Sequence, residues 1–227
     1  DGSRLNTALR DLPGAISVFT RDLIDDLGAT DVMEMLRYDV NFEEGFSDDE
    51  FSGAGAQQGG ISDPDQWRTR GLNASVATDG FQGMGKTDTY NVERADSNRG
   101  PNAILAGSGG TGSRGGGAGN VLNMRTKTAN TFRNSNDIDL KIGEYDTRRA
   151  TMDLNRVLIK DKLALRVMGL LETKGSHQPY RYGDKHSFTL AAQYRLNKDT
   201  SVKVSFENTR TEGVGGRPWN PLDSVTL

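Results

Sequence analysis

Residues 80–87 read GFQGMGKT, which fits the full G-x-x-x-x-G-K-[S/T] pattern of a phosphate-binding loop. That chemistry needs a buried strand before the loop and a helix after it, because the N–H groups of the helix must face the phosphates. The preceding residues 73–78 are too polar for a central parallel strand. Residues 88–99 have no apolar stripe at helical spacing. We therefore predict that the motif binds no nucleotide.

Two other sets of residues could bind a ligand or do chemistry. Residues 48–50 (DDE) could offer carboxylate oxygens to a cation, but we interpret the acidic, glycine-rich segment 43–66 as a long solvated loop. The only two histidines, His177 and His186, lie in or beside an expected loop and have no nucleophile or acid–base partner in the pattern. We expect no catalytic residue, no cofactor and no metal site.

Composition narrows the class of protein. Hydrophobic residues make up 34% of the 227 residues, which is low for a packed globular core, and 28 glycines favour many turns and short strands. The net charge is −3 with both signs interspersed, so we expect no nucleic-acid partner. The chain has no cysteine, which excludes a disulfide framework and a thiolate metal site.

The pattern excludes a membrane-spanning helix but not membrane-spanning strands. No apolar run approaches the roughly 20 residues that a membrane helix needs, whereas a strand needs only about 9–11 residues of alternating polarity. The chain opens with a polar stretch at Asp1, so we expect any leader peptide to lie outside it.

The first 130 residues predict a strand followed by two short helices. The apolar run at 15–19 indicates the strand, and Thr20 is placed to cap a helix that Gly28 would end. Thr30 is the expected cap of a second helix, whose apolar residues repeat at helical spacing. A further strand is expected at 120–128.

Residues 131–227 have a period of two, which predicts strands with one apolar and one polar face. Short turns at 160–161 and 197–199 alternate with longer connections at 175–184 and from Gly213 onward, as in outer-membrane barrels. Periodicity alone fits a soluble antiparallel sandwich equally well. The expected strands contain residues 138–142, 152–158, 163–171, 188–196 and 202–206.

Two segments carry a family resemblance. Residues 92–109 read VERADSNRGPNAILAGSG and residues 119–128 read GNVLNMRTKT, and together they resemble the C-terminal half of the plug domain of TonB-dependent outer-membrane receptors. The residues that carry this match are Glu93, Arg94, Arg99, Gly100, Pro101, Asn123, Thr126 and Lys127.

The resemblance continues upstream in the same order. Arg70-Gly71-Leu72 is similar to the arginine-glycine-aromatic strand of the family, and Asp79-Gly80 to its aspartate-glycine turn. Leu72 departs from the usual aromatic residue, which leaves the family assignment intact and the fine shape of the plug loops open.

The resemblance implies a fold class and a division of the chain. It implies an α+β plug domain over residues 1–130, followed over residues 131–227 by antiparallel β-strands of an incomplete transmembrane β-barrel. Five strands cannot close a barrel, and an open sheet edge cannot face lipid, so we expect the chain to be part of a longer protein.

The resemblance also implies a function in nutrient import. Such receptors lie in the outer membrane of Gram-negative-type bacteria, with the plug gating the barrel lumen, and they take up a scarce nutrient such as an iron–siderophore or other metal chelate. Their partners are the TonB energy-coupling complex, the small-molecule substrate and outer-membrane lipid. Arg70 and Arg99 match two plug arginines that pair with glutamates of the barrel wall. The alternative is a soluble β-rich binding or adhesion module.

Overall fold

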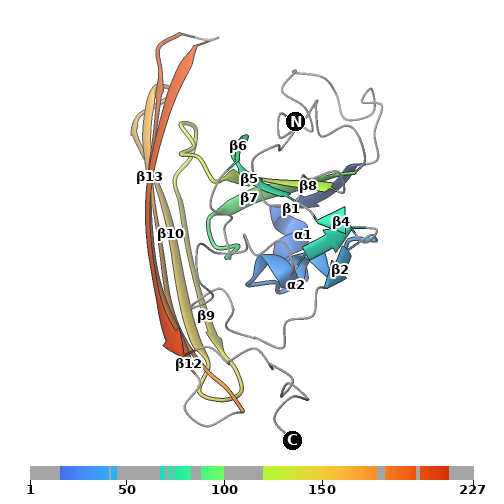
Figure 1. The fold of residues 1–227 in the computed structure, drawn as a ribbon. Coiled ribbons are helices and arrows are strands. Elements are labelled where there is room, and N and C mark those ends of the chain that lie inside the picture. The colour runs from blue at the N-terminus through green and yellow to red at the C-terminus, as the bar shows by residue number, and fades with distance from the viewer. Residues whose placement is uncertain are drawn as a thin grey trace, which may run out of the picture.

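The computed structural model describes residues 16–40, 42–44, 67–69, 72–73, 75–82, 88–99, 120–177, 182–197 and 200–214. Figure 1 shows two groups of elements: long strands that form a tall curved wall, and shorter strands and helices gathered beside it. We call strands β9–β13 the strand wall, and the elements that precede them the plug unit.

The plug unit is built around a five-stranded sheet with the order β1-β7-β8-β5-β6. Helices α1 (Arg21–Asp26) and α2 (Val32–Leu36) pack on this sheet. The strands are β1 (Ile16–Thr20), β5 (Ser75–Thr78), β6 (Phe81–Gln82), β7 (Val92–Arg99) and β8 (Asn120–Thr126). The core between sheet and helices consists of Phe19, Ile24, Ala29, Val32, Met35, Leu36, Val92, Ala95, Leu122 and Met124.

Both helices begin with a side-chain cap. Thr20 Oγ1 accepts a hydrogen bond from Leu23 N at 3.3 Å, and Gly28, with φ of 64°, follows the end of α1, as predicted. The prediction that Thr30 caps α2 is wrong: the cap is Asp31, because a carboxylate here closes a capping box with Glu34. Among the described residues, no helix is long and apolar enough to cross a lipid bilayer.

A small three-stranded sheet of β2 (Phe42–Glu44), β3 (Trp67–Thr69) and β4 (Leu72–Asn73) completes the plug unit. The prediction of a continuous loop over 43–66 is therefore wrong at its start, where Glu43 pairs with Arg68 and Glu44 with Trp67. Pairing across more than twenty residues leaves no local period in the sequence. The acidic residues 48–50 lie outside the described part of the chain.

Strand β5 contradicts the expectation that residues 73–78 cannot form an inner parallel strand. It pairs in parallel with β8 and lies inside the sheet between β8 and β6. A strand of only four residues with a buried Ala77 tolerates a polar composition, because little of its length faces the core. Its context still differs from a phosphate loop, since the described chain resumes at Asp88 and leads into strand β7 rather than a helix.

The strand wall contains all five predicted strands, joined as consecutive antiparallel neighbours in the order β13-β12-β11-β10-β9. They are β9 (Ser135–Ile142), β10 (Arg148–Ile159), β11 (Leu163–Gly175), β12 (Tyr182–Arg195) and β13 (Ser201–Val214). The connection expected over 175–184 is shorter than predicted, because β11 extends to Gly175 and β12 begins at Tyr182. The connection at 143–147 is also short. The predicted contrast between short turns at one end of the wall and long loops at the other is therefore weak.

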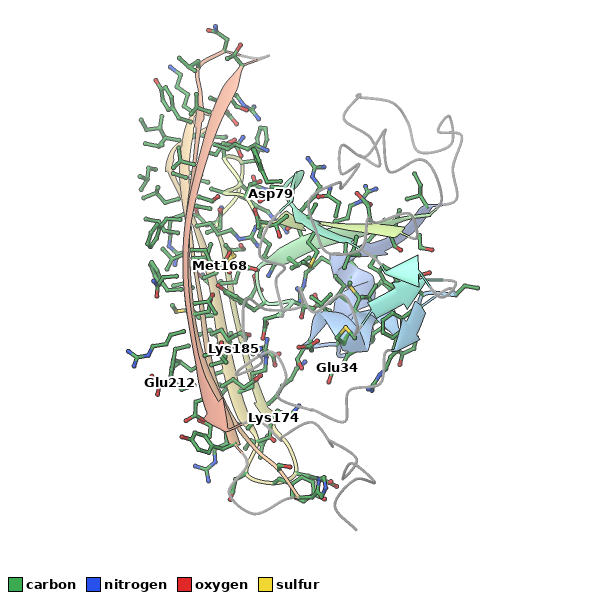
Figure 2. All side chains as sticks on the ribbon, in the orientation of Figure 1. Glu34, Asp79, Met168, Lys174, Lys185 and Glu212 are labelled. Atoms are coloured by element: carbon green, nitrogen blue, oxygen red, sulfur yellow. The ribbon has the colours of Figure 1, made fainter. Side chains whose placement is uncertain are left out.

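The two faces of the strand wall differ in polarity. On the outer face, Leu140 is 72% exposed and Phe206 is 61% exposed, although both are large and apolar. On the inner face, Met168 and Thr189 are buried against the plug unit. Figure 2 places Met168 and Lys185 toward the plug unit. Nothing in the described part of the chain covers the outer face, as the second sheet of a soluble sandwich would.

Candidate functional site: the interface between plug unit and strand wall

A short connector, Asp88–Asn91, touches both parts of the molecule. Thr89 faces the plug helices: its N–H donates to Thr30 O at 3.1 Å, and its hydroxyl donates to Ala29 O at 2.8 Å. Arg21 of α1 donates to Thr89 O at 2.7 Å. Its neighbours Asp88, Tyr90 and Asn91 contact the strand wall instead. The connector therefore joins the plug helices to the wall over four residues.

Asp88 lies in a buried ion cluster with cations from two strands of the wall. Arg149 of β10 donates through both terminal nitrogens, at 2.6 and 2.8 Å, and Lys185 of β12 approaches at 3.2 Å. Arg149 also pairs with Glu172 of β11. The two-point geometry between guanidinium and carboxylate offsets the cost of removing both charges from water.

The electrostatics of this cluster keep Asp88 ionised. Burial alone would raise the pKa of Asp88, but the hydrogen bond from Arg149 and the charge of Lys185 hold it below the ordinary value of 3.8. Asp88 is thus a fixed negative charge on the plug unit, matched to positive charges on the wall.

A second ion cluster lies at the end of β8. Lys127 Nζ is 2.8 Å from a carboxylate oxygen of Asp153 on β10, and Arg166 of β11 donates to the same carboxylate at 2.7 and 2.8 Å. Arg166 also donates to Thr128 O at 3.0 Å, and Glu93 lies 3.9 Å from it. Burial lowers the pKa of Lys127, and the charge of Asp153 opposes that effect.

Between the two ion clusters, neutral groups hold Tyr90. Its hydroxyl lies 2.6 Å from Ser187 Oγ and 2.6 Å from Thr189 Oγ1, and Asn91 donates to Thr189 Oγ1 at 3.0 Å. The ring packs with Met168 and with Leu170. Burial raises the pKa of Tyr90, so its phenol stays protonated and can donate a hydrogen bond.

Asn155 of β10 fixes the chain that links the two parts. Its side-chain oxygen accepts from Asn130 N at 2.8 Å, and its amide donates to Asn130 O at 2.8 Å and to Arg133 O at 2.7 Å. Among the described residues, this interface is made of ion pairs, hydrogen bonds and one small apolar cluster.

Four of the residues singled out in the sequence come together at one turn of the plug unit. Asp79, with φ of 52°, and Gly80, with φ of 83°, form the turn between β5 and β6. Asp79 accepts from Thr126 N at 2.9 Å and from its hydroxyl at 2.7 Å, and Asn123 accepts from Gly80 N at 3.0 Å. These side chains fix the aspartate-glycine turn against β8.

The other residues of the family match are dispersed. Lys127 and Glu93 contribute to the second ion cluster, whereas Arg94 pairs with Asp96 within β7. The structure places the backbone of Arg99 in β7, opposite Asn120. The side chain of Arg99 lies outside the description, as do Arg70, Gly71, Gly100 and Pro101.

Sequence reasoning missed the residues that make the main contacts, namely Asp88, Tyr90, Arg149, Asp153 and Lys185. A usable signal was present, because Arg149 and Asp153 lie on the polar face of an alternating strand. Alternation assigns a side chain to a face but does not identify its partner. His177 contacts Tyr145 in an edge-on ring pair, and the described residues contain no cluster of three or more potential metal ligands.

The matching family model and the similar known proteins point to the same family. Residues 8–114 match the model of the TonB-dependent receptor plug domain. A probable TonB-dependent receptor of Bordetella pertussis, BfrD, is 30% identical over 175 residues, which are 75% of this chain and 21% of that protein. The metal-pseudopaline receptor CntO of Pseudomonas aeruginosa is 28% identical over 98% of this chain and 30% of its own length.

Solved structures share the fold. The pyoverdine receptor FpvA of P. aeruginosa matches with a TM-score of 0.75 at 18% identity, over 92% of this chain and 26% of that chain. The ferric-catecholate import receptor Fiu of Escherichia coli K12 matches with a TM-score of 0.71 at 20% identity, over 90% of this chain and 28% of that chain.

This chain spans less than a third of the length of these curated relatives. The relatives are receptors rather than enzymes, as expected from a sequence without a catalytic set. The plug unit and the open wall of antiparallel strands together share the fold of these solved structures. The chain therefore belongs to the TonB-dependent receptors of the outer membrane, of which it carries the plug domain and adjoining strands of the barrel.

Proposed function

We propose that this chain is part of a receptor that imports a metal chelate, such as an iron–siderophore, through a barrel whose lumen the plug gates. The proposal is supported by the relatives, which are named as receptors for metal-pseudopaline, pyoverdine and ferric catecholate. A chelate is too large and too polar to cross a bilayer unaided, so its import needs a lumen that opens and closes.

The observation that carries the proposal is the contrast between the two faces of the strand wall. The outer face presents exposed apolar side chains such as Leu140 and Phe206, which suit contact with lipid. The inner face presents Arg149 and Lys185, which hold Asp88 of the plug unit. A plug attached mainly through hydrogen bonds and ion pairs, with one small apolar cluster of Tyr90, Met168 and Leu170, would expose little apolar surface if it were displaced.

The remaining parts of the mechanism are also proposals. The TonB energy-coupling complex would supply the work that displaces the plug. Arg70 and Arg99 would pair with glutamates of the barrel wall, as two plug arginines do in the family. We also propose that residues 1–130 form the plug domain and that residues 131–227 form strands of the barrel.

Uptake by the full-length receptor tests the proposed function. Bacteria that lack the receptor gene would be complemented with it, and supplied with radiolabelled iron in catecholate and hydroxamate chelates, or nickel and zinc in aminocarboxylate chelates. We expect accumulation of at least one chelate that requires both the receptor and an intact coupling complex. Accumulation of none of them, or uptake that persists without the coupling complex, would overturn the proposal.

A further inference from the structure

One arginine interrupts the apolar outer face of the strand wall. Asn155 of β10 faces inward, where it holds the chain that links the two parts, so the alternation of the strand places Arg156 on the outer face. Arg156 lies opposite Leu165 of β11, and between Leu154 and Leu158 along β10. It is exposed, and its guanidinium donates to Asn155 O at 3.2 Å. Arg156 is therefore a charge on a surface that otherwise suits lipid.

The depth of Arg156 in the bilayer decides what can compensate its charge. A charged side chain on the lipid-facing surface of a barrel is most destabilising at the midplane of the bilayer and least destabilising near the interfaces. Arg156 lies four residues before Lys160, in the turn that follows β10. Four residues span about 13 Å along a strand, or about 9 Å along the membrane normal if the strand is tilted by about 45°. A long arginine side chain can cover much of that distance and bring its guanidinium to the lipid headgroups.

Two lysines flank the turn at the end of β10. Lys160 and Lys162 are both exposed, and they lie on either side of Asp161, which has a φ of 60°. Lys162 N donates to Ile159 O at 3.0 Å, and Asp161 N donates to Thr131 O at 3.1 Å. Because these bonds fix the turn to the end of the strand and to the segment before β9, the two cations are held at one end of the wall.

The chain does not neutralise these three cations. Within the part of the chain that the structure describes, none of the three forms an ion pair with a carboxylate. The exposed cations at the opposite end of the wall are paired, Arg148 with Asp146 and Arg210 with Glu212. Unpaired positive charge thus distinguishes the end at residues 156–162 from the other end.

Exposed apolar side chains adjoin the cations. Leu158, Ile159 and Tyr194 are all exposed, although they are large and apolar. Ile159 lies opposite Leu163 of β11, and Leu163 lies opposite Tyr194 of β12, so three strands contribute to one apolar band. An apolar band with cations at its edge matches a lipid that has acyl chains and a negatively charged headgroup.

We propose that Arg156, Lys160 and Lys162 bind the headgroup phosphate of an acidic glycerophospholipid, whose acyl chains lie against Leu158 and Ile159. The lipid belongs to the leaflet nearest the 160–161 turn. Its negative charge compensates Arg156 on the apolar face, and its attachment sets the depth of this end of the wall in the bilayer. A zwitterionic lipid offers the same phosphate but brings its own cation, so it binds this site more weakly.

Fluorescence quenching in the full-length receptor, reconstituted in phosphatidylcholine bilayers, tests the proposal. A bimane label on Leu163→Cys, with any other cysteine of the receptor replaced, reports from the position opposite Ile159. Phosphatidylglycerol or phosphatidylcholine that carries a nitroxide on an acyl chain is then titrated into the bilayer. Because each basic side chain near an anionic surface contributes a factor of about five, phosphatidylglycerol should reach half-maximal quenching at a mole fraction lower by about fivefold or more.

Three variants assign this preference to the site. Arg156→Gln should lower the preference for phosphatidylglycerol about fivefold, and Arg156→Lys should keep most of it. The double variant Lys160→Gln, Lys162→Gln changes only an exposed turn, and it should lower the preference at least as much as Arg156→Gln does. Arg148→Gln is the matched control, because Arg148 is an exposed cation at the other end of β10 and is paired with Asp146. It should leave the preference unchanged.

Two results would overturn the proposal for the lipid site. One is equal quenching by the two lipids in the unmodified receptor. The other is an unchanged preference in both Arg156→Gln and the double lysine variant. Inorganic phosphate added to the buffer should not displace the quenching lipid, because acyl chains also hold it. Displacement by phosphate would identify a site for a free anion and would likewise overturn the proposal.

The quenching experiment does not involve transport. It depends on contact between the outer face and lipid, and not on which chelate crosses the lumen. If phosphatidylglycerol is preferred but no chelate is taken up, the proposed function fails and the lipid site stands. If chelates are taken up but the two lipids quench equally, the lipid site fails alone.

Discussion

Asp88 and Arg149 are 61 residues apart in the chain, yet they meet in a buried ion pair with contacts of 2.6 and 2.8 Å. Asp88 begins the connector that reaches the plug helices, and Arg149 lies on the second strand of the wall. Because the side chains are only 7% and 5% exposed, water does little to screen the pair. This contact links the two parts of the molecule electrostatically, as the Lys127–Asp153 pair does at the end of β8.

Replacing Arg149 by methionine should weaken the seating of the plug. Removing one member of a buried ion pair leaves an uncompensated charge, so the free energy of unfolding of the plug unit should fall by about 3–5 kcal/mol. Denaturant unfolding of the detergent-solubilised full-length receptor measures this change. Arg148→Met is the control, because the neighbouring Arg148 side chain is 75% exposed and its loss should cost less than about 1 kcal/mol. Equal losses in the two variants would contradict the account.

Asp88 should make the plug attachment sensitive to strong acid. The pKa of Asp88 in the folded protein lies below 3.8, so ionised Asp88 contributes its full stabilisation above pH 3.8. That stabilisation is lost as the pH falls through the folded-state pKa. Tryptophan fluorescence or hydrogen exchange between pH 5 and pH 2 follows the loss. Asp88→Asn should be less stable at pH 5 and should respond less to acid. An identical acid response in Asp88→Asn would count against the assignment.

Tyr90→Phe should loosen the neutral part of the interface without disturbing the ion pairs. The ring would still pack on Met168, but the hydroxyls of Ser187 and Thr189 would lose a buried partner. A loss of about 1–2 kcal/mol in the free energy of unfolding is expected. Tyr38→Phe is a suitable comparison, because Tyr38 is 63% exposed on the plug unit and its hydroxyl should matter little. A neutral Tyr90→Phe would show that the hydroxyl contacts contribute nothing.

Gly175→Ala should disturb the connection between β9 and β10. A Cβ at position 175 would overlap the backbone carbonyl oxygen of Tyr145, a residue with a φ of 54°, so the backbone would have to shift. We expect a loss of about 1–3 kcal/mol and a crystal structure with a displaced 143–147 connection. Gly169→Ala provides the contrast, since the nearest atom to its Cβ would be the end of Met152 at 3.6 Å. If both alanines are tolerated equally, the close approach is not a constraint.

The strands of the wall could be predicted from the sequence, but the contacts between the wall and the plug unit could not. Apart from Ala191, apolar and polar side chains alternate over residues 187–195 of β12, and the burial pattern of the strand follows the same period of two. Thr20 and Gly28 likewise mark the ends of α1 through local chemistry. These features depend only on neighbours in the chain.

Two of the wrong predictions have a common physical cause: the pairing of β2 with β3 and the parallel pairing of β5 with β8 both depend on segments distant in the sequence. The cap at Asp31 is different, because its capping box with Glu34 is local and Thr30 is an alternative cap one residue earlier. The partner of Asp88 is one of several cations on polar faces, and only the packing of the plug unit against the wall selects Arg149. Long-range selection of this kind leaves no period and no short motif.

Collision accessibility of nitroxide labels along β12, in the full-length receptor in lipid bilayers, shows directly whether the outer face of the strand wall contacts lipid while the inner face contacts the plug unit. Labels at Phe188, Leu190 and Tyr194 should collide mainly with oxygen dissolved in lipid, because these exposed apolar side chains share the outer face. A label at Thr189, which is 1% exposed beneath the plug unit, should collide poorly with oxygen and with a water-soluble nickel complex. Equal accessibility of both sets, or access to the nickel complex at Phe188 and Leu190, would show that the outer face of the strand wall does not contact lipid.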